Sequence, residues 1–138
     1  MERTATAHWK GDLRSGNGTM RLGSGAWEGP FSFKTRFESA PGSQPEELLG
    51  AAHAGCFSMA LSAGLTKAGK RVTSIDTKAV VILEELVITR IDLSTRGVVA
   101  GVTAAEFQAA AEDARANCIV SKALAAVPIT LQATLAAG

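Results

Sequence analysis

The sequence predicts an α+β fold with mostly antiparallel strand pairing. Short segments of alternating polarity fill the first third of the chain, and two helical segments then flank a pair of strand-like runs. A last alternating segment lies near the C-terminus. The resulting order of strands, helix, strands, helix and strand is typical of α+β proteins. At 138 residues, the chain suits a single domain covering residues 1–138.

The N-terminal third is predicted to consist of short strands joined by turns. Polar and apolar residues alternate in Thr4–Trp9, and Gly16-Asn17-Gly18 indicates a turn before a short strand, Thr19–Leu22. Alternation returns in the segment PFSFKTRFE, where the odd-numbered positions of Phe31–Phe37 share one face. We therefore predict a third strand there, with Arg36 on its opposite face.

A long helix is predicted from Pro45 to about Lys67, ending at Gly69. Proline is favoured at a first helical position, and Glu46 and Glu47 suit the positive N-terminal end of a helix. The helix is apolar on nearly all sides, so we expect it to be buried, in part against a partner subunit. Three glycines lower its helix propensity, which predicts close approach by a neighbouring backbone. These glycines are Gly50, Gly55 and Gly64.

Two strand-like runs follow this helix. Ser74–Leu83 and Leu86–Ser94 are separated only by Glu84-Glu85, which predicts an antiparallel hairpin. The run Val80–Ile82 consists of consecutive apolar residues. We therefore expect the first of these strands to be covered on both faces.

A second helix is predicted to begin at Thr103, because Thr103 and Glu106 fit the capping-box pattern. Asn117-Cys118 follows its end, Ser121–Ala126 suits a short further helix, and Ile129–Leu135 alternates as a last strand. The predicted apolar face of the second helix contains Phe107, Ala110, Ala111 and Ala114.

Composition excludes several classes of function. The 14 basic and 13 acidic residues are well mixed and form no basic stripe, so no nucleic-acid partner is predicted. Aromatic residues make up only 5%, which argues against a base-stacking surface. The N-terminus is not a secretory signal, so we expect a cytoplasmic protein. The apolar run Leu48–Leu65 includes His53, Ser58 and Ser62, so we interpret it as a buried helix and not a membrane span.

The chain contains two cysteines, Cys56 and Cys118. In a reducing cytoplasm, two cysteines are more often redox-active, metal-binding or merely buried than joined in a structural disulfide. They form no Cys-X-X-Cys pair, and their spacing from His8 and His53 does not suit zinc, so no metal site is predicted. A free cysteine on a buried helix usually acts as a small hydrophobic residue. The residues alone therefore do not exclude a purely structural role for Cys56.

A reactive cysteine needs a cation nearby, because the thiolate is the nucleophile and a free thiol is mostly protonated at neutral pH. Arg36 is the candidate, since arginine stays charged when buried and offers several donors. A solvated position on a strand is the alternative interpretation of Arg36. A buried Arg36 would need a carboxylate, and both Glu46 and Glu47 are close in sequence. The residues alone do not decide between these two glutamates.

The chain also contains the segments AHWKGDL, FKTRFES, PEELLGAAHAGCFSMALS and TSIDT, and a late Asn-Cys-x-Val-Ser. Together these segments resemble the osmotically induced protein C and organic hydroperoxide resistance (OsmC/Ohr) family, from about Ala7 to Leu135. The first two segments point to the OsmC branch. The resemblance implies an intertwined homodimer, with antiparallel sheets packed around two central helices per chain and two active sites at the subunit interface.

The same resemblance implies a thiol-dependent peroxidase that reduces organic hydroperoxides, and hydrogen peroxide less well, to alcohols. Cys56 matches the peroxidatic cysteine of the family, and Cys118 matches the resolving cysteine. Arg36 matches the arginine that contacts the thiolate, and Glu46 matches the glutamate that holds this arginine. The family reductant is a dithiol, typically the dihydrolipoyl group of a lipoylated protein, and no cofactor is implied. Ile119 departs from the family pattern, because many relatives have proline after the resolving cysteine.

Helix geometry separates Glu46 from Cys56 within one chain. Ten residues of straight helix span roughly 15 Å, and they turn the two side chains about 80° away from a common face. We therefore expect Arg36 and Glu46 to act on Cys56 of the other subunit. Phe57 and Met59 suit either an organic peroxide tail or plain core packing. The alternative function is that of an apolar ligand-binding stress protein without peroxidase activity.

Overall fold

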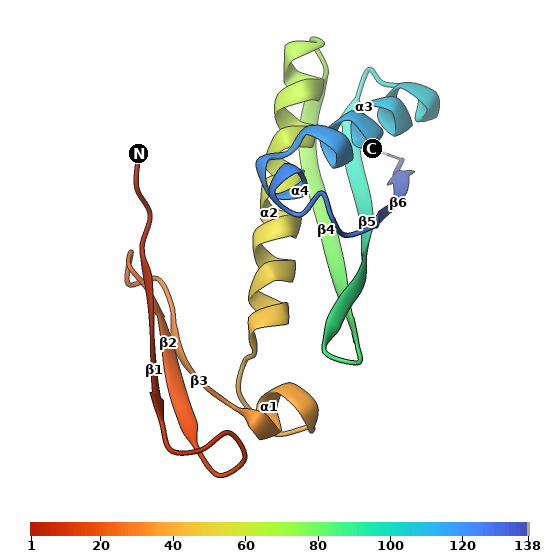
Figure 1. Ribbon diagram of the computed structural model, residues 1–138. Coiled ribbons are helices and arrows are strands. Elements are labelled where there is room, and N and C mark those ends of the chain that lie inside the picture. Colours follow the sequence, from red (N-terminus) through yellow and green to blue (C-terminus); the bar gives the residue numbers. More distant parts are fainter. Residues whose placement is uncertain (138) are drawn as a thin grey trace. The chain divides into compact units, whose positions relative to one another are not determined.

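The computed structural model describes residues 1–137, which form a mixed α+β structure as predicted (Figure 1). Two compact units make up the chain, one of them Met1–Leu48 and the other continuing from Leu49 onward. Each unit has its own three-stranded sheet. The single domain over residues 1–138 stays a prediction.

The first unit is built on an antiparallel sheet of β1 (Ala5–Lys10), β2 (Asn17–Leu22) and β3 (Glu28–Ser32) in that order. Gly18 of β2 pairs with Trp9 on one side and Phe31 on the other. The rings of Trp9 and Phe31 lie 5.3 Å apart between their centroids. A Cβ atom on Gly18 would be only 2.5 Å from the Phe31 ring, so the aromatic pair depends on a glycine between its strands.

The predicted strand over Phe31–Phe37 is wrong in its second half. The strand β3 ends at Ser32, and Phe33–Phe37 forms a short helix, α1. Ser32 and Thr35 form a capping box, in which each side chain accepts a hydrogen bond from the other residue's backbone N–H. Phe33 and Phe37, four residues apart, then pack together with ring centroids 4.9 Å apart. Helical spacing and a cap therefore outweigh the alternating pattern, and Arg36 lies on a helix.

The helix α2 (Pro45–Lys67) has the predicted bounds, and Gly69 follows it at a positive φ of 76°. Its buried face includes Phe57, Leu61 and Leu65, whereas Met59 is 76% exposed. The helix α2 is long and apolar enough to cross a membrane, but core helices of soluble proteins often have the same length and composition. Only 28% of its most apolar window is buried within the chain. Burial of the remaining face against a partner subunit stays a prediction.

The three glycines of α2 differ in what surrounds them. A Cβ atom on Gly50 would make an ordinary contact with Val81 of β4 (Arg71–Glu84) at 3.5 Å. Gly55 and Gly64 have no neighbour within 4 Å in the part of the chain that the structure describes. The predicted close approach of a backbone is therefore not seen at these three glycines among the described residues.

The second unit contains a sheet in the order β4 (Arg71–Glu84), β5 (Val87–Ala100) and β6 (Ile129–Leu135). The predicted hairpin is confirmed between β4 and β5, with both linking residues, Glu85 and Leu86, at positive φ. The last strand instead pairs with β5 in parallel. A parallel neighbour requires a long crossover connection, which the two helices between β5 and β6 provide.

One face of this sheet forms the core of the second unit. Alternate residues of β5 are buried on that face together with Phe57 of α2 and Phe107 of α3 (Ala104–Asn117). Val80 on the opposite face is 40% exposed, so residues 1–137 do not provide the expected cover on both faces of β4. The buried β5 residues are Ile91, Leu93, Thr95, Gly97 and Val99.

The crossover consists of α3 (Ala104–Asn117) and α4 (Ile119–Ala123). The predicted capping box of Thr103 and Glu106 begins α3, and Phe107 is fully buried beneath it. A Cβ atom on Gly97 would be 2.5 Å from the Phe107 ring. The absence of a side chain at Gly97 therefore allows α3 to pack closely on the central strand.

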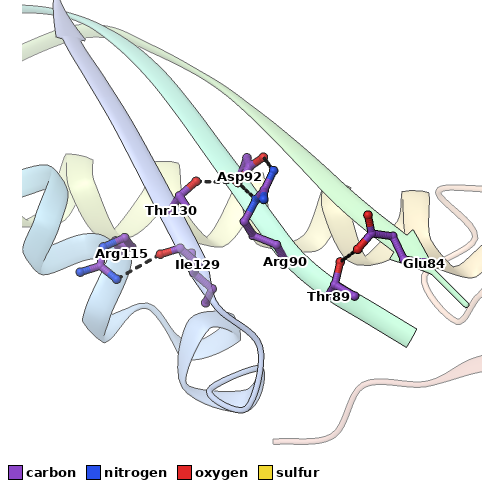
Figure 2. Close-up of polar contacts among 7 residues, drawn as sticks. All are labelled: Glu84, Thr89, Arg90, Asp92, Arg115, Ile129 and Thr130. Atoms are coloured by element: carbon purple, nitrogen blue, oxygen red, sulfur yellow. Dashed lines mark hydrogen bonds and ion pairs between the residues drawn. The ribbon is translucent and has the colours of Figure 1, made fainter. Parts of the chain in front are cut away.

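Polar contacts outside the core join the crossover to the sheet (Figure 2). Arg90 and Thr130 both donate hydrogen bonds of 2.7 Å to the same carboxylate oxygen of Asp92. Arg115 of α3 donates to the carbonyl oxygen of Ile129 at 3.3 Å. These contacts connect β6 with β5 and with α3.

Candidate active site

Arg36 and Glu46 form an ion pair within the first unit. The Nε atom of Arg36 donates to Oε1 and Oε2 of Glu46 at 3.1 and 3.2 Å, and Nη2 also donates to Oε1. The guanidinium carbon of Arg36 lies 5.4 Å from the centroid of the Phe37 ring. This two-donor geometry fixes the plane of the guanidinium group and leaves its remaining N–H donors for another partner.

Glu46 is buried, whereas Arg36 is exposed, with 40% of its side chain accessible to solvent. Burial raises the pKa of Glu46, but the hydrogen bonds and charge of Arg36 outweigh burial. The pKa of Glu46 therefore lies below its usual range. Glu46 is therefore ionised at neutral pH and keeps the pair intact.

Glu47 makes a different contact, although it is the next residue in the chain. Its carboxylate accepts a hydrogen bond of 2.7 Å from the Ser43 hydroxyl. Thr35 in turn donates to the carbonyl oxygen of Ser43 at 2.8 Å. The geometry therefore answers the question that the sequence left open, because Glu46 and not Glu47 contacts Arg36.

Cys56 and Cys118 both belong to the second unit, and both are free thiols. Cys56 lies in the middle of α2, is partly exposed and packs against the core cluster that includes Cys118. Cys118 is 3% exposed and lies at the junction of two helices, as the C-cap residue of α3 and the N-cap residue of α4. The predicted position of Cys118 at a junction is confirmed.

A polar network links α2 to Cys118. Ser121 Oγ lies 3.0 Å from Cys118 Sγ, and the Ser121 backbone N–H donates to the same sulfur at 3.3 Å. On its other side, Ser121 Oγ lies 2.8 Å from Nε2 of His53. All three residues are buried, with exposed fractions of 0% for His53, 4% for Ser121 and 3% for Cys118.

This network was not predicted from the sequence. The Cys118-x-x-Ser121 spacing is a local signal, because an N-cap side chain accepts a hydrogen bond from the residue three positions later. No local signal connects Ser121 to His53, which lies 68 positions away.

The four predicted site residues therefore fall into two groups, one in each unit. Arg36 contacts Glu46 in the first, and Cys56 and Cys118 border one core in the second. Their catalytic roles stay predictions. Within residues 1–137, no three His, Cys, Asp or Glu side chains gather in a way that could hold a metal ion.

Comparison with known proteins places this arrangement in a family. Residues 38–132 match the family of OsmC-like proteins. The chain is 45% identical over 131 residues to the Peroxiredoxin OsmC of Escherichia coli (strain K12) and to that of Shigella flexneri. Each match covers 91% of this chain and 92% of the relative.

Solved structures share the fold at lower sequence identity. An OsmC-like protein of unknown function from Vibrio cholerae has a TM-score of 0.78 at 19% identity, over 96% of this chain and 99% of its own. An organic hydroperoxide resistance protein OsmC from Legionella pneumophila has a TM-score of 0.75 at 18% identity, over 97% of each chain. With two cysteines on one core and close curated relatives named as peroxiredoxins, the chain belongs to the OsmC family and is a cysteine-based peroxidase.

Proposed function

We propose that this protein reduces organic hydroperoxides, and hydrogen peroxide more weakly, to alcohols through a sulfenic acid on Cys56 and a disulfide between Cys56 and Cys118. The observation that carries the proposal is the contact between His53 and Ser121. His53 precedes Cys56 by three residues on α2, and Cys118 precedes Ser121 by three residues. Residues three apart on a helix share a face, so this contact brings the two cysteine-bearing segments together.

The first step uses the exposed part of Cys56. Its thiolate attacks one oxygen of the hydroperoxide, the O–O bond breaks, and the alcohol leaves after taking up a proton. Cys56 is left as a sulfenic acid. Phe57 is fully buried and serves the core, so Met59 is the neighbouring apolar side chain that remains available to an organic tail.

The second step uses Cys118. Its sulfur attacks the sulfenic sulfur, the S–O bond breaks, and water leaves as the disulfide forms. A dithiol then reduces the disulfide by thiol exchange. We propose dihydrolipoamide, carried by a lipoylated protein of the cytoplasm, as this reductant, and the cycle requires no cofactor.

Arg36 and Glu46 are proposed to serve Cys56 of a second subunit in a homodimer with shared active sites. Both Glu46 and Cys56 lie on α2, ten residues apart, and a continuous helix separates such residues by roughly 15 Å. The exposed face of α2 around Met59 supports a subunit contact there. An arginine with free N–H donors, fixed by a carboxylate, would favour the thiolate it faces.

Subunit exchange tests this arrangement. Each single variant, Cys56→Ser and Arg36→Ala, should be inactive alone. Mixed dimers made after exchange should regain activity, because one of their two sites contains both Cys56 and Arg36. Absence of recovery in dimers that mass spectrometry shows to be mixed would contradict sharing between subunits.

Intact mass tests the chemistry itself. One equivalent of cumene hydroperoxide should remove two hydrogens and both free thiols, and dihydrolipoamide should restore them. A protein that only binds apolar ligands would retain both thiols and bind without a change of mass. That outcome would refute the proposed cycle.

A further inference from the structure

In the cycle described above, His53 and Ser121 have no chemical role of their own, although both are buried and Ser121 contacts the resolving cysteine, Cys118. The Ser121 hydroxyl lies between the Cys118 thiol, at 3.0 Å, and the His53 imidazole, at 2.8 Å. A hydroxyl accepts one proton while it donates another, so it can pass a proton along such a chain. We propose that Ser121 and His53 form a proton relay that removes the proton from Cys118 during disulfide formation, with His53 acting through Ser121. This inference rests on the proposed function.

The proton balance of the step is complete. The S–H bond of Cys118 breaks and its proton passes to Ser121 Oγ, while the hydroxyl proton of Ser121 passes to Nε2 of His53. The Cys118 sulfur then bonds to the sulfur of the Cys56 sulfenic acid, whose S–O bond breaks. The departing hydroxide takes up the proton that His53 holds, and the products are a disulfide and water.

The imidazole of His53 has a second nitrogen whose burial the fold does not explain. Its Nδ1 atom is buried without a hydrogen-bond partner among the described residues. Accepting a proton at Nε2 requires Nδ1 to carry the ring's own proton, and an unpaired buried donor costs about 1–3 kcal/mol. Such unsatisfied groups in folded proteins call for an explanation, and a catalytic role is one.

Burial also keeps His53 neutral. It lowers the pKa of His53 and is the sole cause of that shift, with no charged group contributing. The imidazole is therefore in its accepting form at neutral pH. Arg115 of α3 contacts Glu112 and the carbonyl oxygen of Ile129, and Asp92 of β5 contacts Arg90 and Thr130. The other charged side chains of the neighbouring elements are exposed, namely Arg71, Asp76, Lys78 and Glu84 of β4, Arg96 of β5, Glu106 and Asp113 of α3 and Lys122 of α4.

The test separates the two chemical steps in single turnover. One equivalent of cumene hydroperoxide is mixed with reduced protein, and quenched samples are analysed by intact mass for sulfenic acid and disulfide. His53→Gln keeps a hydrogen-bonding group toward Ser121 but cannot take up a proton. It should form sulfenic acid at the wild-type rate and convert it to disulfide at least about 100-fold more slowly at pH 7.

A pH series distinguishes proton transfer from structural damage. At high pH hydroxide can take the proton in place of His53, so the defect of His53→Gln should be clearly smaller at pH 9.5 than at pH 7. Ser121→Ala should behave like His53→Gln, and Ser121→Thr, which keeps the hydroxyl, should recover most of the rate. Thr95→Val is the matched control, because Thr95 also has a buried hydroxyl with two polar contacts but lies outside the network.

The possible results separate failure of the relay from failure of the proposed function. Disulfide formation at the wild-type rate in His53→Gln, or a defect of equal size at pH 7 and pH 9.5, would overturn the relay. If His53→Gln does not fold, Ser121→Ala, which removes one oxygen atom, carries the same test. A wild-type protein that forms no sulfenic acid at all would instead refute the proposed function.

Discussion

Replacing Gly97 with alanine is expected to destabilise the protein by pushing α3 away from the sheet. Gly97 lies on the central strand β5 and is not among the glycines with positive φ, so alanine fits its backbone. The new Cβ would be 2.5 Å from the Phe107 ring, about 0.9 Å closer than the start of ordinary contact at 3.4 Å. Such overpacking costs about 1–3 kcal/mol, and removing glycine's freedom in the unfolded chain offsets about 0.4–1 kcal/mol.

The net loss should therefore be about 1–2 kcal/mol, seen as a lower midpoint of urea unfolding at an unchanged m-value. Phe107→Leu removes the ring that causes the clash, so Gly97→Ala should cost less in that background. A double-mutant cycle should give a coupling free energy of about 1 kcal/mol. An alanine variant as stable as wild type, or effects that add within about 0.3 kcal/mol, would refute this account of how α3 packs.

Three further predictions concern the site. Cys118→Ser should consume about one equivalent of hydroperoxide and then stop, leaving Cys56 open to sulfinic acid; normal turnover with dihydrolipoamide would show that Cys118 is not the resolving cysteine. Glu46→Gln, which weakens the hold on the arginine, should slow peroxide reduction about tenfold in a steady-state assay. Glu47→Gln is its matched control and should stay within about twofold, so equal losses would contradict the pairing. His53 has a lowered pKa, so its contribution to stability is present above about pH 6.5 and is lost as pH falls toward its folded value, because only the unfolded state then binds the proton. Urea unfolding between pH 7.5 and pH 5.5 should show a steeper loss in wild type than in His53→Gln, and parallel losses would argue against a neutral buried imidazole.

Sequence reasoning succeeded where the signals are local. Pro45 and the paired glutamates after it predicted the start of α2, and Thr103 with Glu106 predicted the start of α3. Both depend on contacts within one turn of helix, which a short sequence window contains.

It failed where a second pattern competed or a contact was distant. The alternation of Phe31–Phe37 resembled a strand, but the cap at Ser32 began a helix instead. The parallel pairing of β6 depends on the path of the crossover, which strand alternation does not record. The choice of Glu46 over Glu47 required the contact of Arg36 with the first turn of α2 inside the first unit, because both glutamates suit a helix N-terminus equally well.

Besides its proposed thiol chemistry, Cys118 has a structural role: its sulfur accepts the hydrogen bond that caps the first turn of α4. Movement of this sulfur toward Cys56 as the disulfide forms would remove the cap, and losing an oxygen N-cap costs a helix about 0.5–2 kcal/mol. In the proposed cycle, oxidation would therefore loosen a five-residue helix at the surface of the second unit. The redox state would then be visible in the backbone, as faster hydrogen exchange at the Ser121 amide of the oxidised protein.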